Sequence, residues 1–169
     1  MPLHFAYGSN MDVAAMARRC PASKPLGVAR LARHRFCITA SGYASVARDP
    51  VHAVHGVLWE LALSDVPALD AYEEVGRGLF RKVIQPVLTA GGPKRALVYI
   101  GAETKPGPPL PGYMEGVLAA AHHWKLPAAY LRELRAFTPA GGRATSAVEA
   151  PARPAPAVRP RLATPLDRR

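Results

Sequence analysis

The stretch His4-Phe5-Ala6-Tyr7-Gly8-Ser9-Asn10-Met11-Asp12 begins as an apolar β-run and ends as the opening turn of a helix. Gly8 tolerates backbone angles closed to other residues, which allows a sharp change of direction. Ser9, followed three residues later by Asp12, fits a capping box, and Asn10 is also a good N-cap. The pattern predicts a nest of backbone N–H groups at a helix N-terminus, where anions and developing oxyanions are stabilised. Many strand–Gly–helix turns share the pattern without binding a ligand, so it needs a second element.

A helix is predicted from Ser64 to Val75, further along the chain. Ser64 fits its N-cap, Pro67 still lies within its first turn, and Gly76 is well placed to end it. The buried strand that precedes it is predicted over Val51 to Leu63, with Gly56 marking a bulge or a close approach of two backbones.

Two adjacent carboxylates near the end of this helix point in different directions. Because residues four apart share a helix face, Glu73 lies with Leu69 on the apolar side, and Glu74 lies with Asp70 facing water. Desolvation and the negative end of the helix dipole both raise the pKa of an inward carboxyl group. The spacing therefore favours Glu73 as a general acid or base near neutral pH. The alternative is a half-buried glutamate paired with a nearby arginine, Arg77 or Arg81.

Five motifs occur together and in order over about residues 1–137. They are Phe5-Ala6-Tyr7-Gly8-Ser9-Asn10-Met11, Gly56-Val57-Leu58-Trp59, Leu69-Asp70-x-x-Glu73, Phe80-Arg81-Lys82-Val83 and Pro111-Gly112-Tyr113. The set resembles the γ-glutamylcyclotransferase family, within the γ-glutamylcyclotransferase-like superfamily. Relatives acting on glutathione typically carry Leu in place of Asn10, and those acting on γ-glutamylamines often carry Thr in place of Ser9. The Ser9-Asn10 pair is thus most similar to the branch acting on γ-glutamyl amino acids.

The resemblance implies an α+β fold, with a mixed, strongly curved sheet or small β-barrel and peripheral helices. It implies an enzyme of glutathione metabolism in which the substrate's own α-amine attacks its γ-amide carbonyl. The products are 5-oxoproline and a free amino acid or amine. Glu73 would be the catalytic acid and base, and the turn would hold the substrate carboxylate or the oxyanion. The implied substrate-binding residues are Tyr7, Gly8, Ser9, Asn10, Met11 and Tyr113, and no metal or organic cofactor is required.

Two other functions are compatible with the same residues. One is a γ-glutamylamine cyclotransferase or another amide-processing relative. The other is a non-catalytic module that keeps the pocket to bind a ligand. The sequence also departs from the family pattern at two positions: Phe80 stands where Tyr is usual, and Glu74 follows the catalytic residue where Gly is common.

Nucleophilic and metal chemistry are both disfavoured. Ser9 has no G-x-S-x-G elbow and no supporting His/Asp set, so covalent catalysis is not expected. His52 and His55 lie three apart in a predicted strand, on opposite faces, and the adjacent His122 and His123 splay on a helix. Neither pair has the spacing of a metal site.

The remaining elements are predicted from local patterns. Helices are expected over Asp12 to Cys20, Tyr113 to Trp124 and Pro127 to Phe137, and a strand or strand pair over Leu26 to Thr39. Asp49-Pro50 indicates a turn, and Leu79 to Leu88 with Ala96 to Gly101 indicates a hairpin around Gly91-Gly92-Pro93. The Pro/Ala/Arg-rich residues 140–169 are expected to be a disordered tail, so the domain is predicted to cover residues 1–139.

The formal net charge of +10 does not indicate a nucleic-acid-binding protein, because no stripe of Lys/Arg interleaved with aromatics is present. From Thr138 onward six arginines face two acidic residues, and the other excess charge is scattered. No signal peptide or membrane-length apolar run is visible, and Cys20 and Cys37 form no C-x-x-C pattern. We therefore expect a cytoplasmic enzyme whose partner is a small γ-glutamyl substrate, with no membrane or specific nucleic-acid partner. The oligomeric state is left open.

Overall fold

The structure is a computed structural model that describes residues 1–103 and 105–138. Its strands are β1 (Leu3–Ala6), β2 (Lys24–Ile38), β3 (Ala44–Glu60), β4 (Phe80–Thr89) and β5 (Gly92–Gly101). Its α-helices are α1 (Val13–Arg19), α2 (Val66–Tyr72), α3 (Tyr113–His123) and α4 (Ala128–Arg135). Short 3₁₀ turns cover Ser9–Met11, Leu63–Asp65 and Val75–Arg77. The predicted tail and the predicted domain end at residue 139 lie outside the described residues.

The five strands close into a barrel in the order β1-β3-β2-β4-β5. The long hairpin of β2 and β3 and the shorter hairpin of β4 and β5 are antiparallel, whereas β1 runs parallel to β5. The predicted small barrel is therefore confirmed. The predicted close approach at Gly56 is confirmed too, since a Cβ there would lie 2.1 Å from the carbonyl oxygen of Ala6 on β1.

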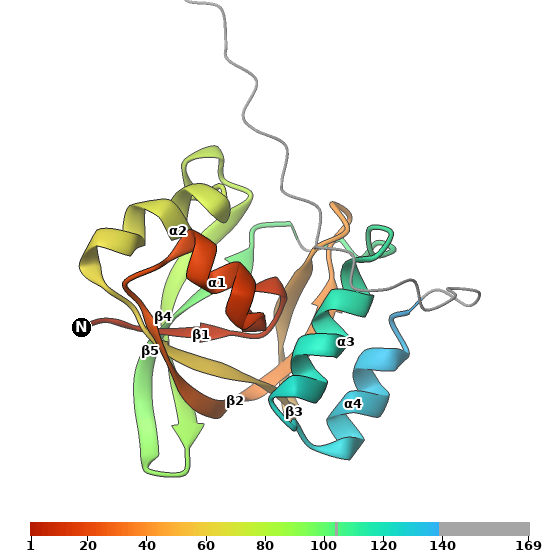
Figure 1. The fold of residues 1–169 in the computed structure, drawn as a ribbon. Helices are drawn as coiled ribbons and strands as arrows, with labels where there is room; N and C mark the ends of the chain where they lie inside the picture. The colour runs from red at the N-terminus through yellow and green to blue at the C-terminus, as the bar shows by residue number, and fades with distance from the viewer. Residues whose placement is uncertain (104, 139–169) are drawn as a thin grey trace, which may run out of the picture.

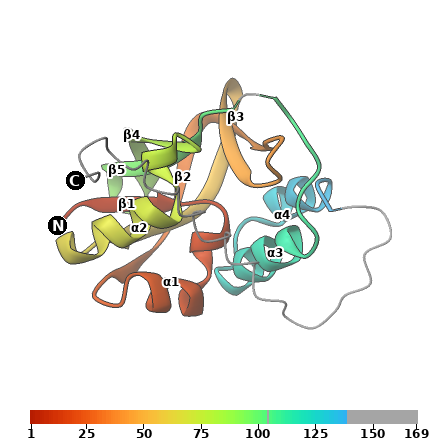
Figure 2. The ribbon, with the colours of Figure 1, turned by 90° about the horizontal axis from the view of Figure 1, so that it is seen from above.

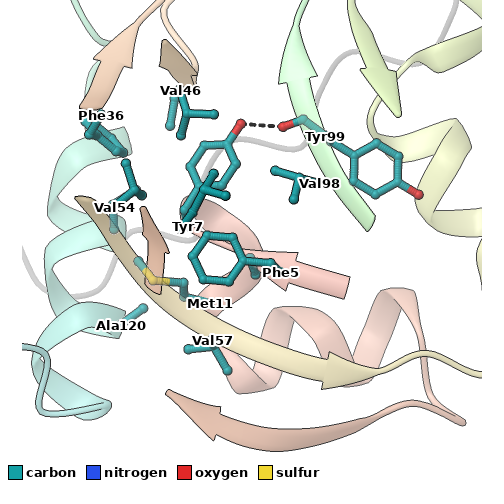
Figure 3. Close-up of a cluster of buried hydrophobic side chains, with 14 of the residues drawn as sticks. Phe5, Tyr7, Met11, Phe36, Val46, Val54, Val57, Val98, Tyr99 and Ala120 are labelled. Atoms are coloured by element: carbon teal, nitrogen blue, oxygen red, sulfur yellow. Dashed lines mark hydrogen bonds between the residues drawn. The ribbon is translucent and has the colours of Figure 1, made fainter. Parts of the chain in front are cut away.

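The helices lie outside the barrel in two groups (Figures 1 and 2). Helices α3 and α4 pack beside each other on one side of the barrel. Helices α1 and α2 lie on the other side, near β1. The aromatic ring of Phe137, just after α4, meets that of Phe36 on β2 edge-on at 5.2 Å. The barrel interior is filled by apolar side chains, among them Phe5, Val54, Val57 and Val98 (Figure 3).

One strand prediction is confirmed in its first form, and another is wrong. Of the strand or strand pair expected over Leu26 to Thr39, the structure has one continuous strand, β2, whose register with β3 shifts next to Arg33, a residue with a φ of 58°. Asp49-Pro50 lies inside β3 opposite this irregularity, not in a turn between strands. The Asp49 carboxylate accepts hydrogen bonds from the amides of Val51 and His52, so the turn-forming chemistry is used in a local bulge of a long strand.

The predicted Ser64–Val75 helix is shorter than expected. Leu63–Asp65 is a 3₁₀ turn without a side-chain cap, so Ser64 does not cap the helix. Pro67 does lie in the first turn of α2, but α2 ends at Tyr72, before Gly76. Glu74 then adopts a left-handed conformation with a φ of 50°, so the helix stops three residues before the predicted Val75.

None of the described helices is long and apolar enough to cross a membrane. Cys20 and Cys37 are both free thiols, not joined in a disulfide.

Candidate active site

Glu73 lies directly after the last residue of α2 and is only 6% exposed. Its amide N–H donates to the carbonyl of Leu69, which fixes the backbone as the helix ends. Its Oε1 accepts a hydrogen bond of 2.7 Å from the side-chain amide of Asn10. The predicted inward orientation of Glu73 is therefore confirmed.

The neighbouring charges are paired elsewhere. Arg77 donates to Glu74 at 2.6 Å, and Asp70 accepts from Lys82 at 2.7 Å. The expected water-facing grouping of Glu74 with Asp70 is replaced by these two ion pairs. Arg77, one of the two arginines considered as a partner of Glu73, therefore pairs with Glu74 instead.

A chain of side chains orients the Asn10 amide. Arg19, at the end of α1, donates to Oδ1 of Asn10 at 2.8 Å. Since a guanidinium has only donors, it bonds to the oxygen of the amide, and the NH₂ group of Asn10 is left to donate to Glu73. The Arg19 guanidinium also stacks 3.7 Å above the ring of Tyr72, whose hydroxyl lies 3.1 Å from Oγ of Ser9. The turn after β1 and the end of α2 are thereby joined by polar contacts.

The turn after β1 differs from the predicted capping box. Asp12, not Ser9 or Asn10, caps α1 by accepting from the amide of Ala15 at 2.6 Å. Ser9 and Asn10 lie one turn earlier, in the 3₁₀ turn. In the described part of the chain, the amide N–H groups of Ser9 and Asn10 have no acceptor. The expected free donors are thus present, but they lie within a 3₁₀ turn and not at the start of the α-helix.

Gly8 is required for space rather than for a positive φ. Its φ is −123°, so the predicted special backbone angle is not of the left-handed kind. A Cβ at this position would lie 3.0 Å from the hydroxyl of Tyr113 and 3.2 Å from Cβ of Ala44. The Tyr113 hydroxyl also accepts from the amide of Ala44 at 3.2 Å. The hydroxyl of Tyr113 therefore lies against the turn after β1, next to Gly8.

A narrow cleft lies between this turn and Glu73. Its free volume is about 20 Å³, close to the space of one water-sized group. The lining residues are His4, Tyr7, Gly8, Ser9, Asn10, Ala44, Glu73, Phe80, Tyr99 and Tyr113. The structure thus brings together Glu73 and five of the six predicted substrate-binding residues.

Met11 is the sixth predicted substrate-binding residue, and it does not reach the cleft. Its side chain is fully buried in the barrel (Figure 3), and its carbonyl accepts from the indole N–H of Trp124. Tyr7 borders the cleft, but its hydroxyl donates to the carbonyl oxygen of Tyr99 inside the barrel (Figure 3). The buried contacts of Met11 and Tyr7 therefore fix the turn after β1 to the rest of the fold.

Tyr99 contributes a polar contact that the sequence did not indicate. Its ring points away from Tyr7 (Figure 3), and its hydroxyl donates to Oδ1 of Asp70 at 2.6 Å. Burial, together with this hydrogen bond to a carboxylate, holds the pKa of Tyr99 far above its usual value. The phenol therefore stays protonated, and its hydrogen bond to Asp70 joins the C-terminal half of α2 to β5.

Among the described residues no group of three or more His, Cys, Asp or Glu side chains is placed to hold a metal ion. His52, one of the histidines considered above, lies 2.9 Å from the carboxylate of Asp49 on the surface.

The sequence of the chain is similar to those of known proteins. Residues 53–134 match the AIG2-like family. The chain is 28% identical over 148 residues to γ-glutamylcyclotransferase of Homo sapiens, covering 81% of this chain and 79% of that protein. The Mus musculus protein of the same name gives the same identity and coverage.

The fold matches a solved structure named γ-glutamyl cyclotransferase. The TM-score is 0.78 with 26% identity, and the match covers 88% of this chain and 95% of that one. The barrel, the turn after β1 and the buried glutamate at the end of α2 are thus found in a chain that is similar to cyclotransferases in sequence and in structure. The chain is thus similar, in sequence and in structure, to proteins named γ-glutamylcyclotransferase, and its residues 53–134 match the AIG2-like family.

Proposed function

We propose that the protein converts a γ-glutamyl amino acid to 5-oxoproline and a free amino acid, with Glu73 as general acid and base. The observation that carries this proposal is the buried Glu73 carboxyl group, held 2.7 Å from Asn10 at the wall of a cleft. A carboxyl group that only supports the fold has no need to border a cleft beside unpaired backbone amides.

The reaction needs one group that moves a proton between two nitrogens. The α-amine nitrogen of the substrate attacks its own γ-carbonyl carbon, and this new C–N bond closes the five-membered lactam. Glu73 takes the proton that the attacking nitrogen loses and delivers it to the leaving nitrogen as the old amide C–N bond breaks. Because the attack is intramolecular, positioning the amine supplies much of the rate. No redox step and no hydrolytic water enters the balance, so we expect no cofactor.

The turn after β1 supplies the electrostatic part of the proposed site. Ser9 and Asn10, whose amides are free in the described part of the chain, line the same cleft as Glu73. Backbone donors that are fixed before the substrate arrives stabilise a developing oxyanion without reorganising. They are equally suited to hold the α-carboxylate of the substrate.

The cleft has a free volume of only about 20 Å³, so it must widen for a substrate to enter. Phe80 lines this cleft and brings no hydroxyl to it, which favours an apolar contact with the substrate there. The Ser9-Asn10 pair favours a γ-glutamyl amino acid over glutathione or a γ-glutamylamine.

The test is a set of parallel incubations of the purified protein. γ-Glutamyl-alanine, glutathione and a γ-glutamylamine are each supplied, and 5-oxoproline and the released amine are measured by mass spectrometry. We expect equal amounts of 5-oxoproline and alanine from γ-glutamyl-alanine, and slower release from the other two. Preferred turnover of the γ-glutamylamine would reassign the substrate, and binding without turnover of any of them would identify a non-catalytic module.

A further inference from the structure

His4 is a buried histidine whose ring has one satisfied nitrogen and one without a partner. It lies on β1, is 2% exposed, and its Nδ1 lies 3.2 Å from the carbonyl oxygen of Leu97 on β5. A carbonyl oxygen only accepts, so Nδ1 carries the hydrogen. Burial lowers the pKa of His4 to about 4, which keeps the ring neutral at pH 7. Nε2 is therefore a bare acceptor.

Within the described residues this acceptor has no donor. Nε2 is buried and makes no hydrogen bond, an arrangement that destabilises a folded protein unless a ligand or water supplies the donor. Two of the tyrosine hydroxyls that line the cleft donate elsewhere: Tyr99 donates to Asp70, and Tyr7 donates to the Tyr99 carbonyl. His4 meets the edge of the Tyr99 ring, with ring centres 5.4 Å apart, and so gains no hydrogen bond from it.

His4 borders the same cleft as Glu73. The cleft wall thus carries two acceptors of different kinds, a carboxylate and a neutral imidazole nitrogen. The free volume of about 20 Å³ matches one water-sized polar group. An amino group is such a group, and it carries the several N–H donors that two acceptors require.

We propose that Nε2 of His4 accepts a hydrogen bond from the α-amino group of the substrate, so that His4 and Glu73 together form an α-amine subsite. This inference rests on the function proposed above and names the part of the substrate that the cleft recognises. It also assigns different tasks to the two acceptors. Glu73 takes the proton from the amine, whereas His4 holds a second N–H and moves no proton.

Two acceptors orient the nucleophile. When two N–H bonds of an amine are held, the direction of its lone pair is set, and it can be aimed at the γ-carbonyl carbon. A single carboxylate leaves the amine free to rotate. The subsite should therefore select a free primary α-amine and exclude substrates in which that nitrogen is missing or acylated.

The first test compares two ligands that differ only in the α-amine. γ-Glutamyl-alanine is the substrate, and N-glutaryl-alanine, which lacks the amine and cannot cyclise, is a competitive inhibitor. In His4→Phe we expect kcat/KM for γ-glutamyl-alanine to fall by about 10-fold to 100-fold, since a hydrogen bond to the amine is lost. The inhibition constant of N-glutaryl-alanine should stay within about 2-fold of the wild-type value. His4→Gln, which returns an acceptor oxygen, should recover part of the lost kcat/KM.

The second test needs no variant. ¹⁵N NMR of the histidine-labelled wild-type protein reports the protonation of each ring nitrogen, and free His4 should show an unprotonated Nε2. Adding γ-glutamyl-alanine should shift the Nε2 resonance, whereas adding N-glutaryl-alanine should leave it nearly unchanged.

The outcomes separate this inference from the proposed function. A shifted Nε2 resonance with no 5-oxoproline would overturn the function and keep the amine subsite. Normal turnover in His4→Phe, or equal weakening of both ligands, would overturn the subsite and keep the function. A protonated Nε2, or no shift of its resonance with γ-glutamyl-alanine, would show that His4 does not bind the α-amine and only packs in the core or bonds to water.

Discussion

The side-chain amide of Asn10 donates a 2.7 Å hydrogen bond to Glu73, and the two residues are 63 positions apart in the chain. The bond joins the turn after β1 to the end of α2, the two elements between which the cleft lies. It is also buried, so it is shielded from competition by water and orders both partners.

Removing this bond should affect catalysis more than the fold. In Asn10→Ala the Glu73 carboxyl group loses its donor, and we expect kcat for γ-glutamyl-alanine to fall by about 10-fold or more. The free energy of unfolding should fall by about 1–3 kcal/mol, because a buried hydrogen bond to a carboxyl group is removed. Steady-state kinetics and urea unfolding measure the two effects. An unchanged kcat would show that this bond does not position the catalytic group.

Arg19 should act through Asn10 and not on the substrate. Arg19→Met removes the donation to Oδ1 of Asn10 and frees the amide to flip, so kcat should fall while KM changes little. The effect should be non-additive with Asn10→Ala, since the double variant loses the same orientation only once. Arg132→Met, at an exposed arginine of α4, is the matched control. Additive losses in the double variant would contradict this chain of contacts.

The left-handed Glu74 should cost stability. Because a side chain with a φ of 50° is strained, Glu74→Gly should be more stable than Glu74→Ala by about 1 kcal/mol. Both variants lose the ion pair with Arg77, so their difference isolates the backbone effect. Thermal or urea unfolding gives the comparison. Equal stabilities would mean that the conformation carries no strain.

Gly8 should not tolerate a methyl group. In Gly8→Ala the new Cβ meets the Tyr113 hydroxyl at 3.0 Å and Ala44 at 3.2 Å, so one wall of the cleft must move. We expect a loss of about 1–3 kcal/mol in the free energy of unfolding and a raised KM for γ-glutamyl-alanine. Ala substitution at Gly76, where a Cβ would meet nothing within 4 Å, is the control and should leave KM unchanged.

His4 should make the folded state sensitive to acid. Its pKa is about 4 in the folded protein, below the 6.5 of an ordinary histidine, so the unfolded chain binds the proton more readily. The stability it contributes is complete above about pH 6.5 and is lost as the pH falls towards 4. Between pH 7 and 4.5 wild type should lose about 2–3 kcal/mol more than His4→Phe, as measured by urea unfolding at each pH. Parallel losses in the two proteins would contradict a buried neutral ring.

The parts of the site that follow local rules could be predicted from the sequence. The strand-to-turn pattern predicted the turn that holds Ser9 and Asn10, although Asp12 and not these two residues caps α1. The spacing of Glu73 from Leu69 predicted an inward carboxyl group, even though α2 ends earlier than its apolar pattern indicated. Helix periodicity predicts the direction of a side chain over one or two turns, and the orientation of Glu73 relative to Leu69 needs no more than that.

The contacts between distant segments could not be predicted. No local pattern pairs Arg19 with Tyr72, because only the packed fold brings the guanidinium onto that ring. Asp12 and Ser9 were both suitable caps, and the choice between them depended on a tyrosine 63 residues further along. His4 did carry a signal, since it is a polar residue on the strand that leads into the decisive turn.

The central claim, that Glu73 moves the proton in the cyclisation, is tested most directly by the kcat of Glu73→Gln with γ-glutamyl-alanine. The amide keeps the size of the side chain and an oxygen that can accept from Asn10, so the variant should unfold at nearly the same urea concentration as wild type. We expect kcat to fall by about 10²-fold to 10⁴-fold, the usual contribution of a positioned acid or base. A folded Glu73→Gln variant that releases 5-oxoproline at the wild-type rate would contradict the account.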